Sequence, residues 1–224
     1  MASADVKVLD LTGLRNLTTL SDYFAAYCPH LEAIHFPPSL PAVTSIPSFF
    51  LYDCQALKSL DLSAFINVTS ISRDFLSGCV GLRNLDFRGF GRVASISDCF
   101  LSGCSGLTTP PDFTPMVALR SIGKSFMSGC CGLTEVELGG LGKVDIIPSD
   151  FLSDCTGLTS INFSGMDSVT TIHEYCLFGC THLMTGRVDM RALGALSAIP
   201  ADMMDTYGAR LLLPHHLGKA VPPS

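Results

Sequence analysis

Apolar residues return along this chain with a period close to 25 positions. Isoleucine marks the same place in successive segments, at Ile46, Ile71, Ile96, Ile122, Ile147, Ile172 and Ile199. The phrase that begins at Ile71, I-S-R-D-F-L-S-G-C, returns at Ile147 as I-P-S-D-F-L-S-D-C. A fixed period of this length is typical of a solenoid, in which each coil buries its apolar side by stacking on its neighbours. We therefore predict one continuous stack of coils.

Residues 57–81 show what one coil contains. Leu60 and Leu62 alternate with Asp61, which is the period-two pattern of a short strand whose leucines face the core. The later apolar residues are three or four positions apart and predict tight connecting segments. The closing F-L-x-x-C phrase, which ends at Cys79, predicts a short helical turn closed by the Gly or Asp before the cysteine. Stacked strands of this kind would pair at about 4.8 Å.

Some coils depart from this template. In the last full coil, Tyr207 stands where the others have cysteine. Two coils carry additional residues just before the strand, at 109–110 and 185–186, and these predict a local bulge. Pro111 replaces a strand leucine, and because proline has no N–H to donate, we expect that strand to be weakened.

The pattern C-x-x-L-x-x-L-x-L followed by L-x-x-I-x-x-x-F resembles the BspA-like, or Treponema pallidum-type, class of leucine-rich repeats. Phrases such as F-L-S-G-C-S-G-L at residues 100–107 are also similar to repeats expanded in kinetoplastid and other parasitic protists. The usual proline after the strand occurs only at Pro37, so the chain is a variant.

The resemblance implies an α/β solenoid: a leucine-rich-repeat stack of about eight coils, with one parallel strand per coil on the concave face. We predict that a single solenoid occupies residues 1–213 and that residues 214–224 form a C-terminal tail. The resemblance also implies a non-catalytic protein, since members of the class commonly bind host or matrix components from a surface or secreted location.

The composition of the chain limits the classes of partner that it is expected to bind. Charged residues make up only 15% of the chain against about 25% in an ordinary soluble domain. The net charge of −6 argues against nucleic acid, which needs clustered Lys and Arg. No segment approaches the roughly 18 apolar residues of a membrane span, so we expect no membrane insertion. The first residues contain no apolar signal segment. Location therefore stays open: cytoplasmic if the chain is complete, surface or secreted if it is a piece of a longer protein.

Ten cysteines raise the question of disulfides or metal. Most occupy one repeat position: Cys28, Cys54, Cys79, Cys104, Cys130, Cys155 and Cys180. We predict a buried column of free thiols that pack as small apolar groups, because parallel side chains do not point at one another as a disulfide requires. The cysteine spacing does not favour zinc, and we expect no cofactor. Cys99 and Cys131 fall at variable positions and are the candidates for exposed thiols.

The outward position between the two strand leucines is mostly acidic. Its members, which we call the strand column, are Asp10, His35, Asp61, Asp86, Asp112, Glu137, Asn162 and Asp189. Carboxylates about 4.8 Å apart repel one another, and we expect this to raise their pKa values. Two interpretations stay open: the column keeps a strand face soluble, or it receives a basic peptide, a polyamine or a divalent cation. Arg88 and Arg191 would neutralise their neighbours, so the charge should be strongest around Asp112 and Glu137.

The chain contains no nucleophile elbow, P-loop or H-E-x-x-H motif. Its Ser and Asp residues recur in coil after coil, whereas catalytic residues are singular, so we predict that it is not an enzyme. Our first hypothesis is a scaffold that binds a protein or basic peptide through its concave strand face. The alternative is the repeat region of a parasite surface antigen or adhesin. The first coil has no polar cap, and an end-to-end contact with another molecule is a further expectation.

Overall fold

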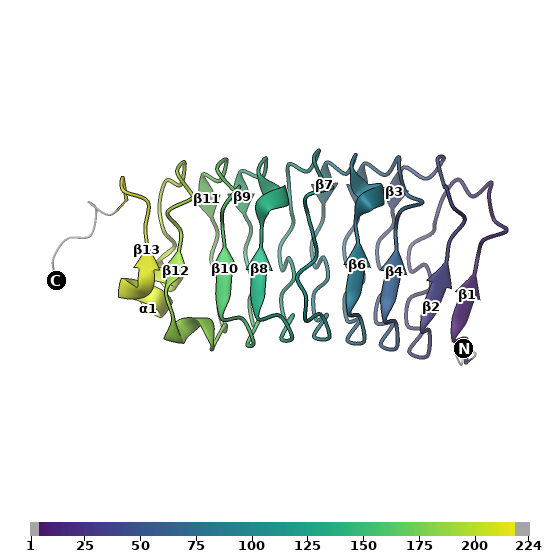
Figure 1. Ribbon diagram of the computed structural model, residues 1–224, viewed down its shortest axis with the longest axis horizontal. Helices are drawn as coiled ribbons and strands as arrows, with labels where there is room; N and C mark the ends of the chain where they lie inside the picture. The colour runs from purple at the N-terminus through teal and green to yellow at the C-terminus, as the bar shows by residue number, and fades with distance from the viewer. Residues whose placement is uncertain (1–4, 218–224) are drawn as a thin grey trace.

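The computed structural model describes residues 5–217 as an elongated solenoid of about eight coils, each about 25 residues long (Figure 1). The coils carry parallel strands that lie side by side along the long axis. The first row, which we call the longer strands, contains the three-residue strands β1 (Val8–Asp10), β2 (Ala33–His35), β4 (Ser59–Asp61), β6 (Asn84–Asp86), β8 (Glu135–Glu137) and β10 (Ser160–Asn162). It ends with β12 (Val188–Asp189) and β13 (Leu211–Leu212), which have two residues each. The solenoid predicted from the apolar period is confirmed.

A second row of strands runs parallel to the first. These strands contain only two residues each: β3 (Ser45–Ile46), β5 (Ser70–Ile71), β7 (Ser95–Ile96), β9 (Ile146–Ile147) and β11 (Thr171–Ile172). The recurrent isoleucine therefore marks a strand of its own, with Ile46 aligned on Ile71 and Ile71 on Ile96. The sequence predicted one strand per coil, because two residues are too few to show alternation.

The longer strands pair in register, although not as one uninterrupted sheet. They form the pairs β1–β2, β4–β6, β8–β10 and β12–β13. Asp61 lies opposite Asp86 and Glu137 lies opposite Asn162, as the repeat alignment requires. Residues 110–112 form no strand, which confirms the expected effect of Pro111.

The interior is filled by columns of identical side chains. Phenylalanine rings at one repeat position stack from coil to coil, with centroids 5.6 Å apart for Phe50 and Phe75 and 5.2 Å apart for Phe75 and Phe100. The stack continues through Phe126 to Phe151, and all five rings are buried. Offset and stacked aromatic pairs of this kind add to the stabilisation from apolar burial.

The predicted short helical turn before each cysteine is wrong for most coils. The backbone instead alternates, with positive φ at every second residue, as at Asp74 (59°), Leu76 (55°) and Gly78 (78°). Their N–H groups bond to neighbouring coils, for example Leu76 N to Phe50 O at 3.0 Å. Apolar residues four positions apart suit a helix, but here the hydrogen bonds run between coils. The Gly or Asp before the cysteine does occupy the left-handed region, which these residues tolerate best.

The last coil is the exception. There the helix α1 (Ala201–Tyr207) replaces the alternating turn. No described helix is long and apolar enough to cross a membrane. At the insertion 185–186 the chain forms the 3₁₀ turn η3 (Leu183–Thr185), so the irregularity predicted just before this strand takes the form of a 3₁₀ turn. At 109–110 the chain forms no ladder that a bulge could interrupt.

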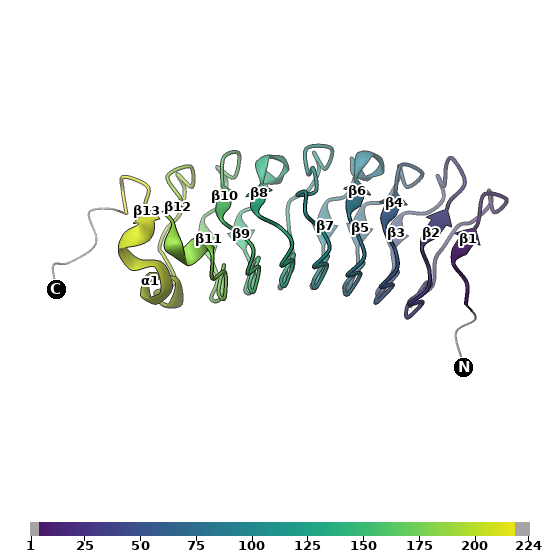
Figure 2. The same cartoon turned by 60° about the horizontal axis from the view of Figure 1, so that its bottom comes forward.

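The two ends of the solenoid differ (Figure 2). At the C-terminal end, α1 closes the last full coil, β13 pairs with β12 of that coil, and His216 Nε2 lies 2.7 Å from Leu196 O. At the N-terminal end, Val8 and Leu14 are 52% and 51% exposed. Three further 3₁₀ turns, η1 (Arg88–Phe90), η2 (Gly139–Leu141) and η4 (Gly208–Arg210), complete the described elements.

Candidate functional site

The outward side chains of the longer strands form one continuous surface, which we call the strand face. It contains the first and third residues of strands such as β4, β6, β8 and β10, together with the residues that flank them. Every member of the strand column lies on this face, either exposed or half-buried. The core leucines and isoleucines between them point inward, so the strand face is where side chains are free to vary.

Most members of the strand column have a structural task that the sequence interpretation missed. Their side-chain oxygen accepts a hydrogen bond from the backbone N–H two residues later and so closes the turn after the strand. The donor N–H belongs to Thr12 for Asp10 (2.9 Å), Ser63 for Asp61 (2.8 Å), Arg88 for Asp86 (2.9 Å), Thr114 for Asp112 (2.9 Å), Ser164 for Asn162 (2.9 Å) and Arg191 for Asp189 (3.1 Å). This is an Asx turn, a bond that Asp and Asn form readily. An Asp or Asn followed two positions later by Ser or Thr, present in four of these six coils, was its signal in the sequence.

The expected rise of the pKa values in this column is wrong for three members. The backbone N–H of Thr12 lowers the pKa of Asp10. Arg88 lowers the pKa of Asp86, and Arg191 lowers that of Asp189, in both cases chiefly through side-chain hydrogen bonds. Donors that bond the ionised carboxylate outweigh repulsion between neighbouring coils, because the carboxylates remain near water.

Arginine cancels part of the acidic charge, as the sequence predicted. Arg88 Nη2 lies 2.6 Å from Asp86 Oδ2, and Arg191 Nη2 lies 2.6 Å from Asp189 Oδ2. Glu137 behaves differently, because it does not close a turn and instead accepts a bond of 2.7 Å from Asn162 Nδ2. Strand β8 also carries Glu135 on the same face, so the acidic charge gathers there.

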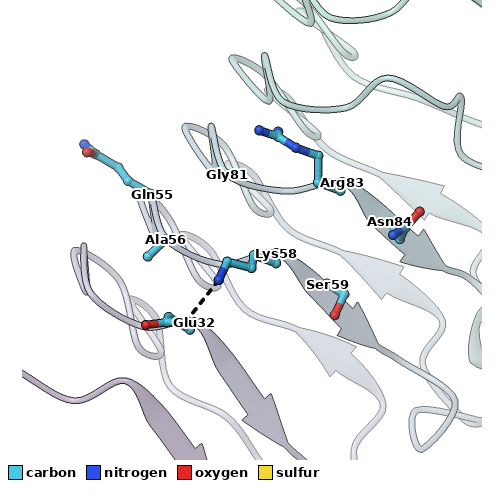
Figure 3. A pocket seen from close by; sticks show the side chains of 8 residues that line it. All are labelled: Glu32, Gln55, Ala56, Lys58, Ser59, Gly81, Arg83 and Asn84. Carbon is cyan, nitrogen blue, oxygen red and sulfur yellow. Dashed lines mark hydrogen bonds and ion pairs between the residues drawn. The ribbon is translucent and has the colours of Figure 1, made fainter.

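A polar pocket opens at the amino-terminal ends of β4 and β6 (Figure 3). It is lined by Glu32, Gln55, Ala56, Lys58, Ser59, Gly81, Arg83 and Asn84. Figure 3 shows the Lys58 side chain directed at Glu32, while the Arg83 and Gln55 side chains extend away from the strands. Of these residues, the sequence had indicated only Asn84, as a neighbour of the strand column. The others could have been found by asking which residues before the strands depart from the threonine of later coils.

One carboxylate is shared by two lysines at this pocket. Glu32 lies 3.4 Å from Lys7 Nζ and 3.2 Å from Lys58 Nζ. Hydrogen bonds from Lys58 and then Lys7 lower the pKa of Glu32. The Arg83 guanidinium donates to backbone carbonyls, at 3.3 Å to Val80 O and 3.4 Å to Leu82 O. Among the described carboxylates, none forms an ion pair with Arg83.

The cysteine column consists of free, mostly buried thiols, as the sequence predicted. All ten cysteines are free, and six of the column's seven members are fully buried. Each of these thiols donates to a backbone carbonyl of the preceding coil: Cys54 to Ala25 (3.0 Å), Cys79 to Leu51 (3.1 Å), Cys104 to Leu76 (3.1 Å), Cys130 to Leu101 (3.2 Å), Cys155 to Met127 (3.2 Å) and Cys180 to Leu152 (3.1 Å). Burial raises the pKa of Cys54, Cys130 and Cys180 to about 12. These thiols therefore belong to the core.

Tyr207 performs the same task in the last coil, because its hydroxyl donates to Leu177 O at 2.7 Å. Of the two cysteines at variable positions, Cys131 is exposed as predicted. Cys99 is only half-buried, and desolvation followed by the charges of Asp74 and Asp98 raises its pKa. The expectation of an exposed thiol is therefore wrong for Cys99.

An aromatic cluster covers the turn edge of the first two coils and also escaped the sequence interpretation. Tyr23 stacks on Phe49 with ring centroids 4.4 Å apart, and the Arg73 guanidinium lies 4.8 Å from the Phe49 ring on the next coil. Tyr27 and Tyr52 extend the cluster at 5.2 Å. Within residues 5–217, no group of three or more His, Cys, Asp or Glu side chains is placed to hold a metal ion.

Parallel strands, coils of about 25 residues and a leucine-rich interior together define a leucine-rich-repeat solenoid. The model of the BspA type leucine rich repeat region matches residues 18–140 and 91–190 in six copies. The chain belongs to this family. Leucine-rich repeat proteins are generally non-catalytic and commonly serve as scaffolds for protein interaction.

Two solved structures share the fold. A leucine-rich repeat protein from Bacteroides ovatus aligns with a TM-score of 0.56 and 20% identity, over 94% of this chain and 57% of that one. The leucine-rich repeat protein of T. pallidum aligns with a TM-score of 0.52 and 18% identity, over 86% of this chain and 89% of that one. The chain thus spans little more than half the length of the Bacteroides protein. A comparison with curated proteins gives no match.

Proposed function

We propose that this protein is a non-catalytic scaffold that binds a protein partner on its strand face. One observation carries the proposal. Inward positions of the strands are apolar from coil to coil, whereas the outward position two residues before each member of the strand column changes from Ser59 to Asn84 to Glu135. A rigid, repeated frame that displays side chains of varying chemistry is the arrangement by which solenoids recognise partners.

The strand column contributes unequally to this surface. Asp10, Asp61 and Asp112 are held by their own turns, so their presence is already explained by the fold. We assign recognition mainly to side chains that no turn requires, above all Glu135 and Glu137 on β8. The surface-antigen role that the family resemblance implies stays a prediction.

A random library of 12-residue peptides displayed on phage, selected against the whole chain, tests the proposal. We expect the selected peptides to bind about tenfold more weakly, or ~1.4 kcal/mol, when Asn84→Trp obstructs the strand face. The matched control is Ile146→Trp, since Ile146 is 42% exposed on the row of short strands. Peptides that lose affinity for the control, or that ignore both changes, would contradict the proposal.

A further inference from the structure

The geometry points to a binding site with two subsites on this face. The first subsite, the pocket at β4 and β6, receives an acidic side chain of a protein partner. At the second subsite, a basic residue of the same partner segment lies against Glu135 and Glu137 on β8. The inference deepens the proposed function and rests on it, because both subsites belong to the strand face. It assigns the partner a chemistry, namely an extended segment that carries one charge of each sign.

The first subsite has unmet capacity to bind a carboxylate. Arg83 uses Nη1 for two long bonds to backbone carbonyls, which leaves Nε and Nη2 without a partner among the described residues. The guanidinium lies over Gly106, where an added Cβ would be 1.7 Å from Nη1 and 2.2 Å from Val80 O, so the missing side chain leaves room for it. A planar guanidinium with free donors is well suited to a carboxylate.

The neighbouring charges are also unbalanced in favour of an anion. Glu32 is the one carboxylate that lines the pocket, and it is shared by Lys7 and Lys58. The pocket lining therefore contains two cations, Lys58 and Arg83, and one anion, while Lys7 adds a further cation beside Glu32. Gln55 and Asn84 add neutral amide donors at the pocket wall.

The basic residues are not required by the repeat. Lys58 and Arg83 occupy the position before the strand that is held by Thr134 and Thr159 in later coils. There, Thr159 Oγ1 donates to Thr134 O at 2.8 Å, and Thr69 and Thr170 make similar inter-coil bonds elsewhere. The first four coils instead carry charged residues at this position, namely Lys7, Glu32, Lys58 and Arg83. Lys58 bonds across coils to Glu32 at 3.2 Å, whereas Arg83 makes no inter-coil side-chain bond among the described residues, so the stack does not account for its charge.

The second subsite lies at a matching distance. Glu135 occupies the same outward position as Asn84, two coils further along the stack. Two coil steps correspond to about 10 Å, which an extended peptide at ~3.3 Å per residue covers in about three residues. A polypeptide can present both charges at this spacing. Nucleic acid presents only negative charge, so it fits the first subsite and is repelled by the second.

Charge reversal tests the assignment with the same displayed 12-residue peptide library. Wild-type protein should enrich peptides with an Asp or Glu three or four positions from a Lys or Arg. Lys58→Glu with Arg83→Glu should weaken those peptides at least about tenfold. A fresh selection on this variant should replace the acidic residue by a basic one while keeping the original basic residue. Arg120→Glu with Lys124→Glu, two exposed sites off the pocket, is the charge-matched control and should change nothing.

The outcomes separate the two claims. Peptides that lose affinity for Asn84→Trp but not for the charge-reversed protein would contradict the proposed first subsite but would still support binding on the strand face. Peptides that ignore both changes would overturn both. If charge reversal prevents folding, Lys58→Gln with Arg83→Gln replaces it, because neutral side chains remove the attraction without adding repulsion. Retained affinity in that folded variant would equally contradict the proposal that the first subsite binds an acidic side chain.

Discussion

The cysteine column and the strand column both repeat once per coil, but they differ in how much of their bonding is repeated. Each buried thiol bonds to a carbonyl of the preceding coil, and Tyr207 supplies the same bond where cysteine is missing. In the strand column, the turn-closing bond repeats while the neighbouring charges do not: Asp86 pairs with Arg88, but Glu137 pairs with Asn162. Repetition therefore identifies the frame, and departure from repetition identifies the surface that is free for recognition.

The largest expected effect on stability comes from placing a charge in the buried core of the solenoid. Ile122→Asp puts an unpaired carboxylate at a position that is 8% exposed in the middle of the stack. We expect the free energy of unfolding to fall by about 4 kcal/mol or more, since the buried charge has no partner. Urea denaturation measures the loss. Thr114→Asp, on the exposed side of the turn, should change stability by less than about 0.5 kcal/mol, and an equal effect of both changes would contradict the core assignment.

Alkaline pH should weaken the frame through the thiols. Burial raises the pKa of Cys130 from 9.0 to about 12, so this contribution is fully present below pH 9 and is lost as pH rises from 9 toward 12. Within that window each such thiol lowers the free energy of unfolding by about 1.4 kcal/mol per pH unit. Cys130→Ser should flatten the pH dependence by that amount, as measured by urea denaturation between pH 8 and 11. An unchanged slope would mean that the thiol is not buried.

A smaller effect is expected from removing one donor of the ladder. Tyr207→Phe deletes the hydroxyl that bonds to Leu177 O and leaves that buried carbonyl without its partner. We expect a loss of about 1–2 kcal/mol in the free energy of unfolding. Tyr175→Phe is the matched control, because Tyr175 is 47% exposed and the same atom is removed. Equal stability of the two variants would show that the ladder bonds contribute nothing.

The smallest effect concerns the turns of the strand face. Asp112→Ala removes the oxygen that accepts the Thr114 N–H, whereas Asp112→Asn keeps it. We expect alanine to cost about 0.5–1.5 kcal/mol and asparagine to cost less than half of that. Asn162 already serves this purpose in another coil. Thermal denaturation of the three proteins decides the matter, and an asparagine variant as unstable as alanine would show that charge, not the bond, is what counts.

Much of the frame could be predicted from the sequence, because burial imposes the same apolar residue at each repeat position. Leu60, Ile71 and Cys79 were placed correctly for this reason. The alternating turn was not predicted, since apolar spacing of four is shared by a helix and by a segment bonded between coils. The pocket was missed because Lys58 and Arg83 precede the strand, where the alternation that separates outward from inward side chains has not yet begun.

The central claim is that recognition resides in outward side chains that close no turn, such as Glu135 and Glu137, rather than in the turn-closing members of the strand column. Two variants remove the same charge from one face: Asp61→Asn with Asp112→Asn, which keeps both turns, and Glu135→Gln with Glu137→Gln. Titration calorimetry with a peptide selected on the wild type compares them directly. We predict about tenfold weaker binding for the glutamate pair and less than about threefold for the aspartate pair. Equal losses, or a larger loss for the aspartate pair, would contradict the account.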